Sequence, residues 1–215
     1  MIAAKATPGK WADCCVTVPR ATAAKLVAMG YVGIVRTLAY KPGAAEGGDI
    51  TAPELAMLTE TGLQVGLYQR VRDPGWLPGQ CDGYADAVAA RTEAQRALYP
   101  AEAHVDQDLE GPGPSTTAAQ ASLYSTDWSH GIAPYEPALY VGYGLPLDAQ
   151  QLYELPHTSY GSDAAHRKVA TRGVAWQQGA PFVLDGITFD SGTMQPDELG
   201  DLPIVATADA LPDAA

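Results

Sequence analysis

The chain has 215 residues, of which 47% are hydrophobic and 18% charged, a size and composition typical of one large globular domain and incompatible with wholesale disorder. Lys and Arg number 13 against 25 Asp and Glu, and the resulting net charge of −12 argues against a surface built to bind nucleic acid or an anionic membrane. The 3 cysteines include no C-x-x-C pair, so we expect buried free thiols and no metal or other cofactor.

The first ten residues lack the apolar stretch of a secretory signal, and no run of about 18 apolar residues occurs anywhere in the chain. We therefore expect a soluble protein that carries no export signal of its own. We also expect it to be monomeric.

Helix and strand signals alternate along the first half of the chain. Thr51 and Glu54 have the spacing of a capping box, in which each side chain accepts from the other residue's backbone N–H, and Gly62 is placed to end the helix that begins there. The same order of helix, glycine and apolar strand occurs upstream around Gly30. The pattern predicts strands near residues 11–14, 31–35, 63–68 and 103–109, with helices over 21–29, 52–61 and 84–98.

The second half continues the alternation with weaker signals. A helix is predicted over 118–128 and another over 147–155, with strands over 138–143, 158–161, 173–177 and 187–189. About eight strands at intervals of about 25 residues indicate a single α/β domain, a (β/α)8 TIM-type barrel with short or irregular late helices. The rival, a doubly wound sheet, needs a glycine-rich turn after the first strand, and residues 13–19 contain no glycine. We place the barrel at residues 1–200 and an acidic, weakly structured tail at 201–215.

The densest functional signal is acidic. Asp106, Asp108 and Glu110 alternate along one predicted strand, so their carboxyl groups share one face, about 6–7 Å apart. At the carboxyl end of a barrel strand, such groups raise one another's pKa, which suits the general acid and base of glycoside cleavage. The alternative is a solvated acidic loop. His104 could belong to a metal site, but a packed core histidine fits its place deep in the strand better.

Aromatic residues give a second signal, because sugar rings stack on Tyr and Trp. Tyr68, Tyr143 and Trp176 fall at predicted strand ends, where they could form the walls of a sugar site or simply close the barrel top. Gln177 is a candidate hydrogen-bonding partner for the same sugar. Arg36, at the end of the second strand, could pair with Asp13 or the acidic cluster and lower the pKa of one carboxyl, or form a salt bridge without catalytic meaning.

Several short motifs in one order resemble a known family. The chain is similar, over about residues 10–195, to the glycoside-hydrolase-like domain of unknown function found in actinobacterial exported proteins and phage lysins, a relative of the family-25 lysozymes. The motifs that carry the resemblance are Trp11-Ala12-Asp13, Gly30–Arg36, Ile50–Glu54, Thr61–Val65, Val105–Asp108, Tyr140–Gly144, Trp176-Gln177 and Ile187–Asp190.

The resemblance implies roles for particular residues. Asp13 matches the acidic residue that ends the first strand, Asp106 and Asp108 match the acidic pair of the fourth strand, and Asp190 matches the acidic residue that ends the last strand. The lysozyme pair ends in Glu, whereas this chain has the shorter Asp108. Read two residues further, Asp106-x-Asp108-x-Glu110 resembles the fourth-strand motif of chitinase-type barrels, in which the final Glu is the acid.

The resemblance implies a barrel that acts on the peptidoglycan of bacterial cell walls as a lysozyme-like or endolysin-type glycosidase. Asp106, Asp108, Glu110 and Asp13 are then catalytic candidates, and Asp190 shapes the sugar site. The alternative is a catalytically inactive glycan-binding barrel. We expect the protein to stay in the cytoplasm until it is released, or to act from a virion or at the host cell envelope if a bacteriophage encodes it.

Overall fold

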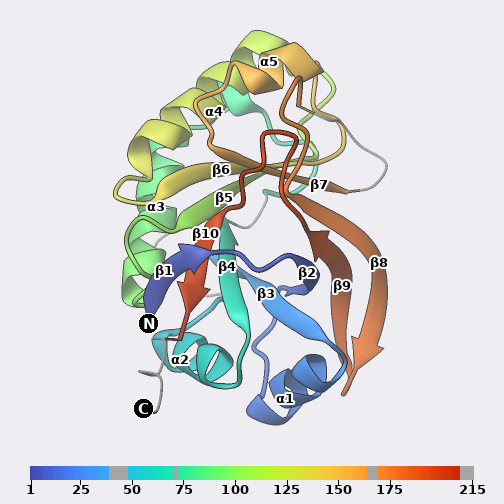
Figure 1. Ribbon diagram of the computed structural model, residues 1–215. Helices are drawn as coiled ribbons and strands as arrows, with labels where there is room; N and C mark the ends of the chain where they lie inside the picture. The colour runs from blue at the N-terminus through green and yellow to red at the C-terminus, as the bar shows by residue number, and fades with distance from the viewer. Residues whose placement is uncertain (39–47, 70–71, 164–168, 209–215) are drawn as a thin grey trace.

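The structure is a computed structural model, and it describes residues 1–38, 48–69, 72–163 and 169–208. Helices lie on the outside of a sheet that closes on itself (Figure 1). The elements, in chain order, are β1 (Ile2–Lys5), β2 (Gly9–Cys14), α1 (Arg20–Ala28), β3 (Tyr31–Leu38), α2 (Ala52–Glu60), β4 (Gln64–Gln69), a 3-10 turn η1 (Pro78–Gln80), α3 (Gly83–Arg96), β5 (His104–Leu109), α4 (Ala118–Gly131), β6 (Glu136–Val141), α5 (Ala149–Tyr153), β7 (Ser159–Asp163), β8 (Trp176–Leu184), β9 (Ile187–Met194) and β10 (Ile204–Thr207).

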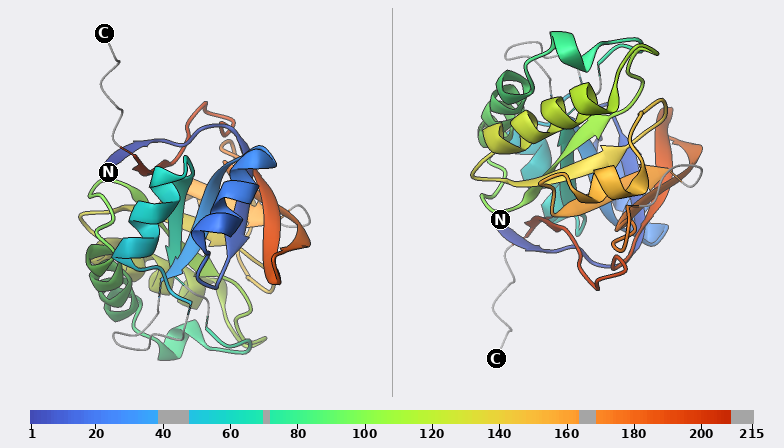
Figure 2. Two further views of the ribbon diagram at one scale, coloured as in Figure 1. Left: turned by 90° about the horizontal axis from the view of Figure 1, so that it is seen from below. Right: turned by 90° about the horizontal axis from the view of Figure 1, so that it is seen from above.

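Among the described residues, eight strands, β2 to β9, form the closed barrel. Neighbouring strands from β2 to β8 pair in parallel, and β9 closes the barrel by pairing antiparallel with both β8 and β2. α1 and α2 face the viewer when the barrel is seen from below, and α4 and α5 when it is seen from above (Figure 2). The predicted α/β barrel is therefore confirmed, with an antiparallel last strand.

The reversal of β9 follows from a tight turn. Asp185 and Gly186 separate β8 from β9, and both have positive φ, 53° and 80°, as a two-residue hairpin turn requires. An Asp-Gly pair between apolar residues is a strong hairpin signal, which the sequence analysis did not use. The late part of the barrel thus has a hairpin where a regular (β/α)8 barrel has a helix.

The chain ends contribute two further strands. β10 pairs with β4 at Ala206 and Val65, and β1 pairs with β10 along four residues. The pairing of β4 with β5 begins only at Leu67, so β10 fits beside the part of β4 that precedes it. The expected tail at 201–215 is therefore wrong for residues 204–207, which are ordered by strand pairing, while residues 209–215 lie outside the described part.

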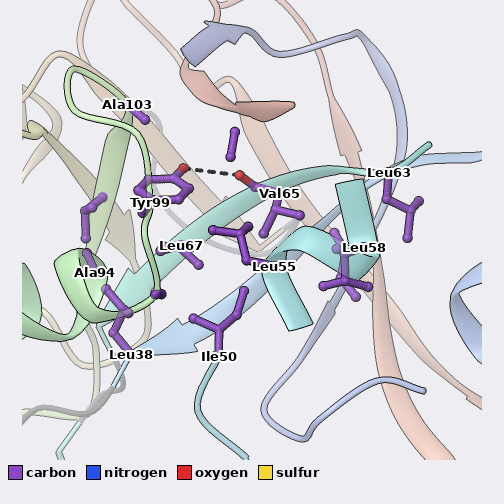
Figure 3. Packing of buried hydrophobic residues seen from close by; sticks show 14 of the residues in the cluster. Leu38, Ile50, Leu55, Leu58, Leu63, Val65, Leu67, Ala94, Tyr99 and Ala103 are labelled. Atoms are coloured by element: carbon purple, nitrogen blue, oxygen red, sulfur yellow. Dashed lines mark hydrogen bonds between the residues drawn. The ribbon is translucent and has the colours of Figure 1, made fainter. Parts of the chain in front are cut away.

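The main core lies between the outer barrel wall and its helices. Leu55 and Leu58 of α2 are fully buried, each stabilising the fold by about 1.5–3 kcal/mol. Tyr99 packs on the same cluster and donates a hydrogen bond from its hydroxyl to the Val65 carbonyl, 3.2 Å (Figure 3). Within the described residues, no helix is long and apolar enough to cross a membrane.

The lower barrel interior is filled by two tryptophans, Trp11 from β2 and Trp176 from β8. Side-chain atoms at Gly33 or Gly192 would overlap the rings of Trp11 and Trp176, respectively. Glycine at these positions lets the strands approach the indoles closely. The packed floor leaves the open space of the barrel at the opposite end, where the parallel strands terminate.

Candidate active site

A cavity of about 470 Å³ lies at the carboxyl ends of the parallel strands. This is the end at which barrel enzymes place their reacting groups. The lining residues share a polar or aromatic character, with few exceptions. They are Asp13, Cys15, Val35, Tyr68, Asp106, Asp108, Glu110, Tyr140, Asp163, Trp176, Gln178, Gly179 and Asp190.

The acidic triplet, in β5 and the residue that follows it, lines this cleft as its alternation predicts. Asp106, Asp108 and Glu110 all face the cavity and remain partly accessible. The intervening Gln107 and Leu109 are buried on the helix side. Gln107 accepts a hydrogen bond from Ser125 of α4, which fixes the register of the strand against that helix.

Asp13 and Asp190 meet across the β2–β9 pair, where they are direct partners in the register. Burial raises the pKa of Asp13 to about 8, with a further contribution from the charge of Asp190, while Arg36 lowers it. Burial also raises the pKa of Asp106 to about 7. Both carboxyl groups are thus disposed to hold a proton close to neutral pH.

The floor of the cleft offers these carboxyls few donors. Asp13 Oδ1 is buried and has no hydrogen-bond partner among the described residues. Asp190 is better supported, because the Gln178 amide donates to its Oδ2 at 2.8 Å. The Tyr140 hydroxyl donates in turn to the side-chain oxygen Oε1 of Gln178, so β6, β8 and β9 are joined by one chain of side chains.

Tyr68 of β4 and Tyr140 of β6 line the wall on either side of β5. Burial, together with the nearby carboxylates, raises the pKa of both phenols above the usual range. Both therefore stay neutral and can donate hydrogen bonds. With Trp176 they give the cleft aromatic surfaces on which the apolar face of a sugar ring can stack.

Glu110 is placed by its neighbours on both sides. Its side chain lies against Gly142, where even a methyl group would overlap it. The Trp76 indole N–H donates to the Glu110 carbonyl at 2.9 Å, and Gly75 N–H donates to the next carbonyl, that of Gly111, at 2.8 Å. The loops that follow β4 and β6 therefore hold the backbone of Glu110 at the rim.

Three predicted site residues lie outside the lining. Arg36 is buried on the other side of the barrel wall, where it pairs with Glu54 at 3.0 Å rather than with Asp13, as in the salt-bridge alternative. Its charge still lowers the pKa of Asp13. Tyr143 lies in the turn beyond β6 and is 47% exposed. Gln177 points away from the cleft, because Trp176 and Gln178 occupy the alternate positions of β8 that face inward.

Five lining side chains were not predicted from the sequence: Cys15, Val35, Tyr140, Asp163 and Gln178. Strand parity could have found Tyr140 and Gln178, and Asp163 is an acidic residue two positions after the strand predicted over 158–161. Of the thiols, Cys14 is buried as expected, whereas Cys15 is exposed at the cleft rim.

His104 is a core residue, as its position indicates. Its Nδ1 accepts from the Ile204 N–H at 2.8 Å, and its Nε2 lies 3.0 Å from the Thr158 hydroxyl. Burial lowers its pKa to about 4, so it is neutral and ties β10 to the barrel. Among the described residues, no group of three or more His, Cys, Asp or Glu side chains is arranged to hold a metal ion.

Comparison with solved structures finds the same fold in several proteins. The Tat-secreted protein Rv2525c of Mycobacterium tuberculosis, in complex with L-tartrate, has a TM-score of 0.68 at 14% identity, over 91% of this chain and 99% of that one. A muramidase from Trichobolus zukalii has a TM-score of 0.59 at 14% identity, over 88% and 94%. The catalytic domain of endolysin ply40 from bacteriophage P40 of Listeria monocytogenes has a TM-score of 0.57 at 15% identity, over 88% and 94%.

The likeness at these identities is one of fold. No family model matches the sequence, and no curated protein matches it either. The barrel fold that the sequence motifs imply is confirmed, and it is the fold of this muramidase and this endolysin catalytic domain.

Proposed function

We propose that this protein is a glycoside hydrolase that acts on bacterial cell-wall polysaccharide by general acid and base catalysis with carboxyl groups. The observation that carries the proposal is the convergence of Asp106, Asp108 and Glu110 with Asp13 and Asp190 on one cleft at the carboxyl end of the barrel. Similarity in fold to a muramidase and to an endolysin catalytic domain supports peptidoglycan as the substrate. The activity is then exerted at a cell envelope, after release from the cytoplasm or delivery by a phage.

Cleavage needs one carboxyl group that donates a proton to the glycosidic oxygen and one carboxylate that assists attack at the sugar carbon. In this proposal the donor is Asp108 or Glu110, which lie side by side on the rim. As the bond to the leaving oxygen breaks, water supplies a hydroxyl group to the sugar carbon, and the remaining proton restores the acid. Asp13, Asp106 and Asp190 surround the same sugar and bind its polar groups.

Clearing of purified peptidoglycan and release of reducing ends test the proposal, with the wild type compared with Asp108→Asn and Glu110→Gln. We expect the variant that removes the proton donor to lose about 10²–10⁴-fold in rate, and the other variant to lose less. Glu154→Gln, an exposed change at the end of α5, serves as the control with the same change in charge. A wild type that releases no reducing ends contradicts the enzyme proposal.

A second candidate is a glycan-binding barrel without catalysis. The net charge of −12 favours it, because an acidic surface slows encounter with an anionic wall, whereas a lytic enzyme gains from attraction. Co-sedimentation with peptidoglycan in the absence of reducing ends identifies this case.

A further inference from the structure

The floor of the cleft, formed by Asp13, Asp106 and Asp190, is acidic. Among the described lining residues there is no Lys, Arg or His. Arg36 faces the opposite side of the barrel wall, where it is bound to Glu54 and to backbone oxygens. Its charge lowers the pKa of Asp13 but does not overcome the effect of burial.

The floor of the cleft also lacks hydrogen-bond donors. Gln178 supplies one donor to Asp190, whereas the buried Oδ1 of Asp13 has no hydrogen-bond partner among the described residues. The high pKa of Asp13 and of Asp106, about 8 and about 7, expresses the cost of placing a negative charge there. A ligand that brings positive charge and several donors removes that cost.

We propose that the sugar unit bound at this floor carries a free amine, so that the preferred glycan is a de-N-acetylated hexosamine polymer. The inference rests on the proposed function and names the substrate class of that same cleft. An ammonium group supplies three donors and one positive charge to Asp13, Asp106 and Asp190. An N-acetyl group supplies one donor and no charge, and the lactyl carboxylate of muramic acid adds a further negative charge.

The remainder of the protein agrees with a cationic polysaccharide. Aromatic walls from Tyr68, Tyr140 and Trp176 suit the ring faces of a hexosamine whether or not its nitrogen is acetylated. The net charge of −12 attracts a polyamine chain from a distance, whereas it repels an anionic one. The same acidity that counts against binding to an anionic wall therefore favours this substrate.

Binding of two matched oligosaccharides tests the inference. We expect a β-1,4-linked glucosamine tetramer to bind at least tenfold more tightly than its fully N-acetylated counterpart, as measured by isothermal titration calorimetry. Asp13→Asn and Asp106→Asn should each reduce this preference severalfold, and Glu154→Gln should leave it unchanged. The preference should also decrease as salt concentration rises, because it is electrostatic.

Equal or tighter binding of the N-acetylated tetramer overturns the inference, and so does absence of binding by the glucosamine tetramer. A preference that persists in both Asn variants overturns it too, since the amine is then bound elsewhere. These results are independent of the hydrolysis assay on whole peptidoglycan. Hydrolysis of acetylated wall without an amine preference supports the proposed function alone, and an amine preference without hydrolysis supports the inference alone.

Discussion

Two groups of buried charge lie on opposite sides of the same barrel wall, and they differ in the partners that the protein offers them. On the outer side, Arg36 of β3 is fully buried and bound to Glu54, which also accepts from the Val18 N–H at 2.9 Å. On the inner side, the buried Oδ1 of Asp13 in β2 has no hydrogen-bond partner among the described residues. Asp13 and Arg36 are separated by one residue in register, because Asp13 pairs with Val35 and Cys14 pairs with Arg36.

The difference shows which charges belong to the fold and which face a ligand. A buried ion is tolerated when hydrogen bonds and an opposite charge replace water, as Glu54 does for Arg36. A carboxyl group without such partners raises its pKa and lowers stability, so the inner group is costly to the folded state. Such a cost at a cleft is typical of a site that acts on a ligand.

The outer pair should dominate stability. Glu54→Gln leaves the Arg36 guanidinium buried without an opposite charge, and we expect the free energy of unfolding to fall by about 3–5 kcal/mol in urea titrations. Glu60→Gln is the control, since Glu60 forms a surface pair with Arg20, with both side chains about 60% exposed, and its loss should cost under about 1 kcal/mol. Equal effects of the two changes would show that the buried pair is not structural.

The position of the Glu110 side chain in the cleft should depend on the space that Gly142 leaves for it. Gly142→Ala places a methyl group against the Glu110 side chain, so we expect a loss of about 1–3 kcal/mol in stability and slower clearing of peptidoglycan. Gly66→Ala is the control, because its added methyl group meets other atoms only at 3.7 Å or more. Wild-type behaviour of Gly142→Ala would mean that Glu110 does not need its present position.

Sequence reasoning succeeded where the relevant geometry is local. The two-residue period of a strand sufficed to place Asp106, Asp108 and Glu110 on one cleft, because it depends on no distant contact. The Thr51 cap also formed, with its hydroxyl accepting from the Glu54 N–H at 3.4 Å. The other half of the expected capping box did not, because the Glu54 carboxylate binds Arg36 instead.

Contacts between residues that are far apart in the sequence could not be predicted from local patterns. Glu54 and Arg36 are 18 residues apart, and the fold must bring the start of α2 to the end of β3 before their ion pair can replace the cap. The pairing of β10 with β1 and β4 joins both ends of the chain, so no local pattern predicts it. The sequence could therefore leave two alternatives for Arg36, but it could not name Glu54 as the partner.

The inner carboxyls should also make stability depend on pH. The pKa of Asp13 is about 8 in the folded state and about 4 when unfolded, so folding takes up a proton between these values. Stability should therefore fall as pH rises from about 4 to about 8. Asp13→Asn should flatten this slope and raise the free energy of unfolding at pH 8 by about 1–3 kcal/mol. Urea titrations across this range measure it, and an unchanged slope contradicts the raised pKa.

We expect the smallest change in stability at Trp76, because its indole binds the backbone carbonyl of Glu110 and not the carboxyl group. Trp76→Phe removes the N–H donor to the Glu110 carbonyl but keeps an aromatic ring against Tyr124, so we expect a loss of about 0.5–1.5 kcal/mol in urea titrations. Tyr84→Phe, at a side chain that is 52% exposed, should stay within about 0.5 kcal/mol of the wild type. If Trp76→Phe matches this control, the backbone bonds from Gly75 and Gly113 suffice to hold the rim, and Glu110 owes its place to the loops rather than to the indole.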